Sequence, residues 1–467
     1  MIIRFGYLNN LVGTTLASCF LSLSLGNLLS WSSPVIPKLE NVTSDNPFGK
    51  VITSSQESWL SSLVTLGAVI GCWIFGAVSE VIGRKIVYIS LGVFISLGYV
   101  LMAAIHKLEV YYAARFLQGV ALGGAFNLML TYLGEITSKE NRGVVMTASA
   151  MMSSAGAIFC YAIGPYVSVT TFNTIELTFP IAFLVTSLIF CEESPYFFLL
   201  KNKEELAKKV LKIYRCSNYD LENDIKEMKE QIRIQKEGNV MDIFKTKGYI
   251  KALITGIGLM IGQQFTGINA ILMYSQSIFA LTGSSLSPEI GSLIIAVIQL
   301  FSGGLTPFIS QKFDRKSILL SSGLGMIISE VSLGIYCIFK DAGKTSDSIN
   351  FIPILALTIF TMSYNFGFGP LCWLVPGEIM PARVKIFTIS ALISIYFGIG
   401  FLIAQFFNSA VDAVGIGSIF LFFAGCCFVS CLFIKFFVIE TRGKSLEEIQ
   451  DILNGKTSSI GSNDGIK

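Results

Sequence analysis

The chain is short of charge. Only 14% of its 467 residues are Asp, Glu, Lys or Arg, whereas a soluble domain averages about 25%, and the mean hydropathy is +0.66. The net charge of +3 is too small to indicate a surface for nucleic acid. These deficits exclude an ordinary soluble domain and indicate a protein built for a lipid bilayer.

Groups that carry chemistry are equally scarce. Histidine occurs once, at His106, and the ten cysteines lie mostly inside apolar runs, without the spacing of metal ligands or of a disulfide framework. The sequence shows no Ser/His/Asp set, metal cluster or phosphate loop. We therefore expect no enzyme, no cofactor and no metal site. The apolar N-terminal run lacks a convincing cleavage site, so we interpret it as a retained span.

Long apolar runs are what the chain has instead. Twelve of them reach the length of about 20 residues that a membrane helix needs, and one hydrophilic stretch, rich in Lys and Glu with helical spacing, separates six from six. We predict an all-α membrane protein of twelve transmembrane helices in two halves. The predicted divisions are an N-terminal half 1–193, cytoplasmic linker helices 194–247, a C-terminal half 248–440 and a cytoplasmic tail 441–467.

Cations mark one side of the predicted membrane. They gather in alternate short loops, for example Arg84 and Lys85 after the second run and Arg315 and Lys316 after the eighth. By the positive-inside rule, both termini and the central segment are cytoplasmic. The sequon Asn41-Val42-Thr43 falls in a loop predicted to lie outside. We expect Asn41 to be glycosylated and the protein to reach a secretory-route membrane such as the plasma membrane.

The two halves repeat one another. GEITSKENRG at 134–143 is echoed by GEIMPARVKI at 377–386, and IGRK at 82–85 by FDRK at 313–316. Glu-Ser after the sixth run, at 193–194, is echoed by Glu-Thr after the twelfth. One duplication explains all three pairs. Duplicated halves with a site between them at the midplane are a transporter architecture.

Four stretches carry a family resemblance across nearly the whole chain. They are ARFLQGVALGGAFNLMLTYLGEITSKENRG, GQQFTGINAILMYSQSIF, GFGPLCWLVPGEIMPARVK and IETRGKSLEEI. These resemble the fourth-helix, seventh-helix, tenth-helix and C-terminal signatures of the sugar porter family of the major facilitator superfamily. The run LSWSSPVIPKLE after the first span is most similar to insect facilitated trehalose transporters. The resemblance implies carriage of a neutral sugar, trehalose or a hexose, by alternating access.

The seventh run holds three amides, Gln263, Gln264 and Asn269. Amides donate and accept hydrogen bonds, as sugar hydroxyls do, but amides also bond neighbouring membrane helices. An unbroken helix, at ~100° per residue, would spread the three over different faces. Gly262 and Gly267 permit a local break, so the amides can converge. The resemblance assigns matching positions to sugar contact, and we predict the same here.

Other positions take their roles from the resemblance. It implies sugar contact for Gln299, Asn365 and Trp373, and Trp can stack on the apolar face of a pyranose. Tyr274 matches a position near the outer gate of the seventh helix, with core packing as the alternative. Gly and Pro permit a membrane helix to bend, so we predict gate positions on the tenth helix at Gly369, Pro370 and Pro376. The chain departs from the family pattern on the fifth and eleventh helices. There it has Ala150 in place of Gln, and Tyr396-Phe397 in place of Asn-Trp.

The repeated charges at the predicted cytoplasmic helix ends form a candidate latch between the halves. For any single cation, orientation in the membrane is the plainer interpretation, but the duplicated spacing from Glu to cation favours the latch. Exposed ion pairs contribute about 0–1 kcal/mol each, so several could bias two states. The candidate residues are Arg84, Lys85, Glu135, Arg142, Glu193, Arg315, Lys316, Glu378, Lys385 and Glu440.

Three functions remain open to the sequence: sugar uniport, proton-coupled sugar symport, and a transport-deficient sugar receptor on the same fold. Proton-driven members of the resembled family place an acid in the first span, partnered by an Arg in the fourth. Here Arg115 is present, but no charged residue occurs from Tyr7 through Ser33. We therefore predict uniport. The particular sugar and the oligomeric state stay undetermined at this stage.

Overall fold

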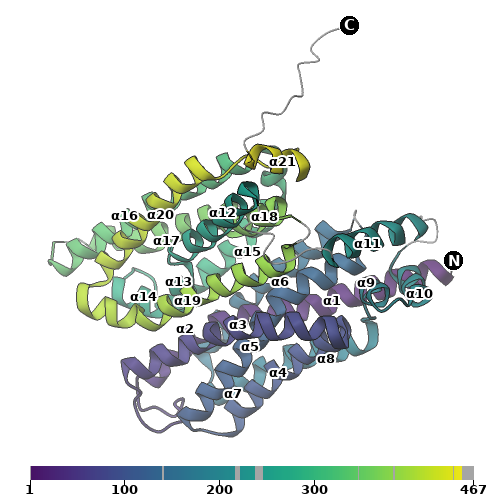
Figure 1. Cartoon of the computed structure of the whole chain (residues 1–467). Helices are drawn as coiled ribbons and strands as arrows, with labels where there is room; N and C mark the ends of the chain where they lie inside the picture. Colours follow the sequence, from purple (N-terminus) through teal and green to yellow (C-terminus); the bar gives the residue numbers. More distant parts are fainter. Residues whose placement is uncertain are drawn as a thin grey trace.

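The computed structural model describes residues 2–138, 141–215, 221–236, 246–344, 347–381, 384–444 and 446–454. Within these ranges the secondary structure is helical and no β-strand occurs, in agreement with the predicted fold class. The helices form two bundles, one from each half of the chain (Figure 1). The start of α1, the linker helices and α21 lie at one end of the molecule (Figure 1), which we call the cation-rich end because Arg84 and Arg315 lie there.

The N-terminal half crosses between the two ends six times. Two of its crossings are composite: α1 continues into α2, and α7 into α8. Its helices are α1 (Ile2–Ser30), α2 (Ser32–Leu39), α3 (Ser54–Ile82), α4 (Arg84–Ala104), α5 (Leu108–Ile136), α6 (Arg142–Ile163), the 3-10 helix η1 (Gly164–Tyr166), α7 (Val169–Glu176) and α8 (Thr178–Phe190).

Three helices follow, and the spacing of apolar residues predicts the second and third as amphipathic helices. They are α9 (Pro195–Leu200), α10 (Glu204–Tyr214) and α11 (Leu221–Lys236). They share a small core of their own around Leu199, Leu211 and Ile225. The Tyr214 hydroxyl lies 3.0 Å from Thr14 Oγ1 of α1 and donates to the carbonyl oxygen of Phe190 at 3.1 Å. These bonds attach the linker to the N-terminal half.

The C-terminal half repeats the six crossings, again with two composite ones. Here α12 to α14 form one crossing, and α17 with α18 another. Its helices are α12 (Lys247–Gln264), α13 (Ile268–Met273), α14 (Ser275–Thr282), α15 (Pro288–Lys312), α16 (Arg315–Asp341), the 3-10 helix η3 (Asp347–Ile349), α17 (Ile352–Phe366), α18 (Phe368–Ile379), α19 (Lys385–Val414), α20 (Ile416–Phe437) and α21 (Leu446–Leu453).

Eleven helical segments of the described residues are each long and apolar enough to cross a bilayer, against twelve predicted runs. The remaining run is the seventh, which is broken rather than absent. Gly267 adopts φ +74°, in the left-handed region that glycine enters at little cost, and the chain turns there between α12 and α13. The helix continues through Gly262 and ends at Gln264, so only one of the two predicted glycine positions makes the break.

Glycines let α3 and α5 approach backbone to backbone in the N-terminal half. A Cβ on Gly119 would lie 2.2 Å from the Val64 carbonyl oxygen, and a Cβ on Gly123 would lie 2.0 Å from that of Ala68. Small residues at membrane helix interfaces allow this close packing. The arrangement holds α5 tightly against α3. The following turn of α5 faces the C-terminal half, where Asn127 donates to Ser390 Oγ.

Candidate functional site

The break in the seventh crossing brings the predicted amides together. Asn269, two residues after Gly267, donates from Nδ2 to Gln264 Oε1 at 2.9 Å. Gln263 donates from Nε2 to the Tyr364 hydroxyl at 2.9 Å and to the Gly369 carbonyl oxygen at 3.1 Å. All three amides are almost fully buried. We call Gln263, Gln264 and Asn269 the amide group.

The amide group keeps unused hydrogen-bonding atoms. Gln263 Oε1 and Gln264 Nε2 are buried and make no hydrogen bond of good geometry to the protein, although the Tyr396 hydroxyl lies close to Gln264 and Asn269. Gln299 Oε1 on α15 is likewise buried without such a bond. A buried polar atom without a partner costs about 1–3 kcal/mol. Within the amide group, one donor and one acceptor are therefore left without a well-formed protein hydrogen bond.

The other predicted contact positions do not all join this group. Asn365 donates to Ser302 Oγ at 3.1 Å and to the Thr361 carbonyl oxygen at 3.0 Å, which ties α17 to α15. Within the described part of the chain, no hydrogen bond links Gln299 or Asn365 to the amide group. Ala150 lies exposed on α6. Asn365 thus acts here as a bond between helices.

Trp373 lies beside the amide group within a cluster of four rings that spans both halves. Its ring centroid is 5.0 Å from that of Tyr396 and 5.9 Å from that of Phe126, and Phe126 is 5.1 Å from Phe397. Tyr396 interacts electrostatically with Gln264 and Asn269. We call Phe126, Trp373, Tyr396 and Phe397 the aromatic bridge. The sequence analysis missed Phe126, although a bulky ring in the glycine-rich run GVALGGAFN was a usable signal.

The predicted gate residue Tyr274 lies where the C-terminal half meets Ser58 and Ser61 of α3. The Tyr274 hydroxyl donates to the Ala404 carbonyl oxygen at 2.9 Å, and its ring stacks on Phe407 at 5.1 Å. In the tenth crossing the helix breaks at Gly367, next to the predicted gate positions Gly369 and Pro370, while Pro376 lies inside α18. These breaks give the helices places to bend.

At the end opposite the cations, hydrogen bonds join the two halves. Ser32 of α2 donates to the Met273 carbonyl oxygen at 3.1 Å, and Ser62 of α3 donates to Gln405 of α19 at 2.6 Å. Asn408 of α19 donates to Glu57 of α3 at 3.3 Å. We call these contacts the seam. They close the molecule at this end.

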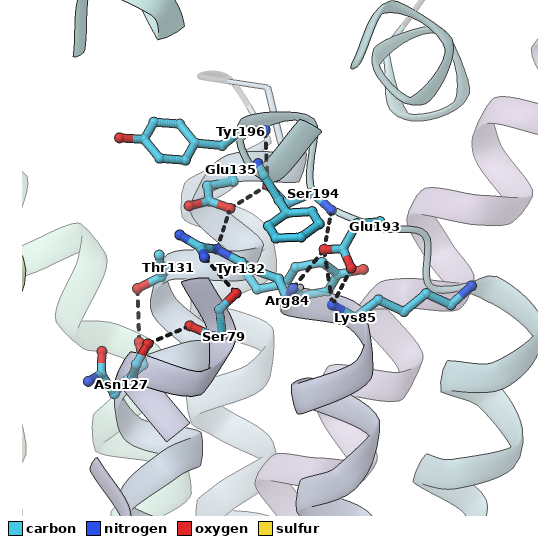
Figure 2. Close-up of polar contacts among 12 residues, drawn as sticks. Ser79, Arg84, Lys85, Asn127, Thr131, Tyr132, Glu135, Glu193, Ser194 and Tyr196 are labelled. Atoms are coloured by element: carbon cyan, nitrogen blue, oxygen red, sulfur yellow. Dashed lines mark hydrogen bonds and ion pairs between the residues drawn. The ribbon is translucent and has the colours of Figure 1, made fainter. Parts of the chain in front are cut away.

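At the cation-rich end, one compact polar network belongs to the N-terminal half (Figure 2). The Glu193 carboxylate accepts from the backbone N–H groups of Arg84 at 2.7 Å and Lys85 at 3.2 Å, and so caps the start of α4. Arg84 Nε lies 3.6 Å from Glu135 Oε2, and Ser194 donates to the same carboxylate. A carboxylate at a helix N-terminus is favoured by the helix dipole.

The C-terminal half repeats this network position by position. Glu440 accepts from the backbone N–H groups of Arg315 at 3.1 Å and Lys316 at 3.0 Å, at the start of α16. Arg315 Nη2 lies 3.5 Å from Glu378 Oε1, and Thr441 donates to Glu378 at 2.6 Å. The duplication that the sequence indicates is therefore also a duplication of contacts.

Among the described residues, the bonds of these two networks stay within one half each, so the proposed latch between halves remains a prediction. Glu135 pairs with Arg84, whereas Arg142 donates to the Gly134 carbonyl oxygen at 2.5 Å. The side chain of Lys385 lies outside the described residues.

Partial burial raises the pKa of Glu440, but the backbone N–H groups that donate to its carboxylate have the larger effect and hold this pKa below its ordinary value.

A buried carboxyl that the sequence analysis missed lies at the end of α7. Glu176, the last residue of α7, is 1% exposed and its two oxygens have no hydrogen-bond partner. Tyr99 interacts electrostatically with both Glu176 and Arg115. The Arg115 guanidinium lies over the Trp31 ring at 4.8 Å and donates to the Leu28 carbonyl oxygen at 3.1 Å. The signal was a lone acid in the sixth apolar run.

Known proteins share this architecture and sequence. The sequence profile described as "Sugar (and other) transporter" matches residues 18–453. A facilitated trehalose transporter of Bombyx mori is 29% identical over 92% of this chain and 84% of its own length. One from Polypedilum vanderplanki is 28% identical over 94% of this chain and 87% of its own length.

Solved structures agree on the fold. A partially occluded inward-open structure of the E. coli xylose transporter XylE has a TM-score of 0.77 at 19% identity, over 94% of this chain and 100% of that one. The proton:xylose symporter XylE bound to 6-bromo-6-deoxy-D-glucose also scores 0.77, at 20% identity, over 96% and 100%. The chain thus shares the fold of these structures.

The sequence profile and the apolar helices together define the class of protein as a membrane transporter. The chain belongs to the sugar porter family, as the resemblance predicted, and is a sugar transporter rather than an enzyme.

Proposed function

We propose that the protein carries a neutral sugar, trehalose or a hexose, down its gradient by uniport. The observation that carries this proposal is the amide group, with unused donor and acceptor atoms of Gln263 and Gln264 beside an aromatic ring that suits a pyranose face. Uncharged amides serve neutral hydroxyls without the cost of burying an ion. The names of the matched relatives support trehalose as one candidate.

Alternating access supplies the mechanism. The seam bonds the halves at one end, while the polar networks at the other end bond each half to itself. Breaking the seam and docking the cation-rich ends would expose the amide group to the opposite side. The sugar contributes the differential binding between the two states that such a shift requires.

We assign the cation-rich end to the cytoplasm of a plasma membrane. The loops with Arg84 and Arg315 lie at this end, in line with the positive-inside rule, and exposed Asn41 lies at the other end. A mass shift that glycosidase removes from the wild type, and that Asn41→Gln lacks, is the expected result. A shift retained in Asn41→Gln would contradict the assignment of the sequon.

Proton-coupled symport is the second candidate, and Glu176 is the observation that favours it. A buried carboxyl without partners, which shares Tyr99 with Arg115, provides a group that could take up and release a proton. The first span still lacks a carboxyl, and for that reason we keep uniport as the leading proposal.

Reconstituted vesicles distinguish these functions. Under uniport, radiolabelled sugar equilibrates and an imposed inward proton gradient drives no accumulation. Uphill accumulation that a protonophore abolishes, and that Glu176→Gln lacks, would establish symport instead. Specific sugar binding without any uptake would identify a receptor.

A further inference from the structure

The aromatic bridge closes the space next to the amide group from the side of the N-terminal half. Phe126 is the one ring of the bridge that this half contributes, and it contacts both Trp373 and Phe397. Centroid distances of 5.1 and 5.9 Å are those of aromatic rings in direct contact. No sugar ring fits between Phe126 and its two partners while these contacts persist.

The position of Phe126 is fixed by its helix. The glycine faces of α5 and α3 pack backbone to backbone one to two turns before it. The next residue, Asn127, donates to Ser390 Oγ of α19 at 2.8 Å and to the Cys72 carbonyl oxygen of α3 at 3.0 Å. The ring therefore stands on a rigid support, anchored on both sides of the boundary between the halves.

The aromatic bridge also connects directly to the atoms that would bind sugar. Tyr396 contacts Trp373 and interacts electrostatically with Gln264 and Asn269. On the same face of α19, one turn further along, a Cβ on Gly400 would lie 2.8 Å from Asn269 Nδ2. The amide group is thus enclosed by Gly400 and Tyr396, and Phe126 lies one ring beyond them.

We propose that Phe126 is a size-selecting residue that favours single-ring sugars over disaccharides. Resting on the proposed sugar transport, the inference narrows the substrate to a monosaccharide. A hexose needs only the amide group and Trp373, whereas a disaccharide such as trehalose needs a further ring-sized space, which Phe126 fills. A difference of one methylene in a pocket changes selectivity by about 10- to 200-fold. The volume of a whole phenyl ring is therefore large enough to discriminate between a monosaccharide and a disaccharide.

The test measures uptake of radiolabelled D-glucose and trehalose into proteoliposomes that hold the full-length protein. The wild type should take up glucose at least about tenfold faster than trehalose. Phe126→Ala should lower this ratio about tenfold by raising trehalose uptake, with Phe126→Leu intermediate. Phe116→Ala removes a half-buried ring of the same helix outside the aromatic bridge and should leave the ratio unchanged.

Each outcome decides the matter. Equal wild-type uptake of both sugars, or an unchanged ratio in both Phe126 variants, would overturn the size selection while leaving sugar transport intact. Absence of all sugar uptake and binding in the wild type would refute the proposed function, and the size selection with it. If Phe126→Ala fails to fold, Phe126→Leu and competition of wild-type glucose uptake by excess trehalose remain decisive, and strong competition contradicts the proposal.

Discussion

At the residue scale, the amide group combines bonds that hold it in place with atoms left free. Asn269 is held on Gln264, and Gln263 on Tyr364. Gln263 Oε1 and Gln264 Nε2, the other polar atoms of these two side chains, form no such bond. A site that is already positioned before the sugar arrives loses less conformational entropy on binding, which suits a carrier that must bind and release in each cycle.

Removing either anchor of the amide group should weaken sugar binding. We expect Gln264→Ala and Asn269→Ala to reduce uptake at limiting sugar by several-fold, because each hydrogen bond contributes about 0.5–1.5 kcal/mol. Uptake and surface expression should be measured together. Asn365→Ala, which loses bonds between helices, serves as the comparison and should affect stability more than affinity. Unchanged uptake in the first two variants would remove these residues from the site.

At the element scale, Gly267 decides the shape of the seventh crossing. Its φ of +74° is unfavourable for other residues, and a Cβ there would lie 2.5 Å from Phe423 Cδ2. We expect Gly267→Ala to destabilise the protein by at least about 1–2 kcal/mol and to abolish most uptake. Thermal unfolding of the purified protein tests this.

Gly425→Ala is the matched control, since a Cβ at this helical position meets nothing within 4 Å. It should be neutral or stabilising, because alanine favours the helix by up to about 1 kcal/mol. Equal effects of the two substitutions would contradict the role assigned to the break.

Glu440 caps an element in a pH-dependent way. Its pKa is depressed in the folded protein, so its stabilisation is present above the ordinary carboxyl pKa and is lost as pH falls through the folded value. We expect Glu440→Gln to cost about 0.3–1 kcal/mol near pH 7, with the difference from wild type disappearing in acid. A pH-independent cost for Glu440→Gln would refute the assignment.

At the scale of the whole molecule, we propose that the seam sets the balance between the two states of alternating access. Asn408→Ala removes a bond from α19 to the Glu57 carboxylate and should loosen the closed end. We expect faster labelling by an impermeant maleimide of a cysteine introduced at Ser61, which is fully buried there, by about 2- to 10-fold for 0.5–1.5 kcal/mol.

The control for this measurement is Asn173→Ala, which loses the hydrogen bond that Trp31 Nε1 donates to Asn173 Oδ1 within one half. It should leave the labelling rate of Ser61→Cys unchanged. Equal rates in Asn408→Ala and the parent protein would show that the seam does not set the balance.

The sequence by itself determined the crossings, the duplication and the family, because apolar length, loop charge and repeated motifs are local properties of the chain. It also located Gln263, Gln264 and Asn269, since polar side chains stand out within an apolar run. Only the tertiary structure decided which residues meet. Phe126 reaches Trp373, and Glu176 shares Tyr99 with Arg115, through helix packing between residues far apart in the chain. Asn365 donates to Ser302 rather than to the amide group for the same reason. The neighbours of a helix face depend on how the helices cross, and the local sequence does not specify that crossing.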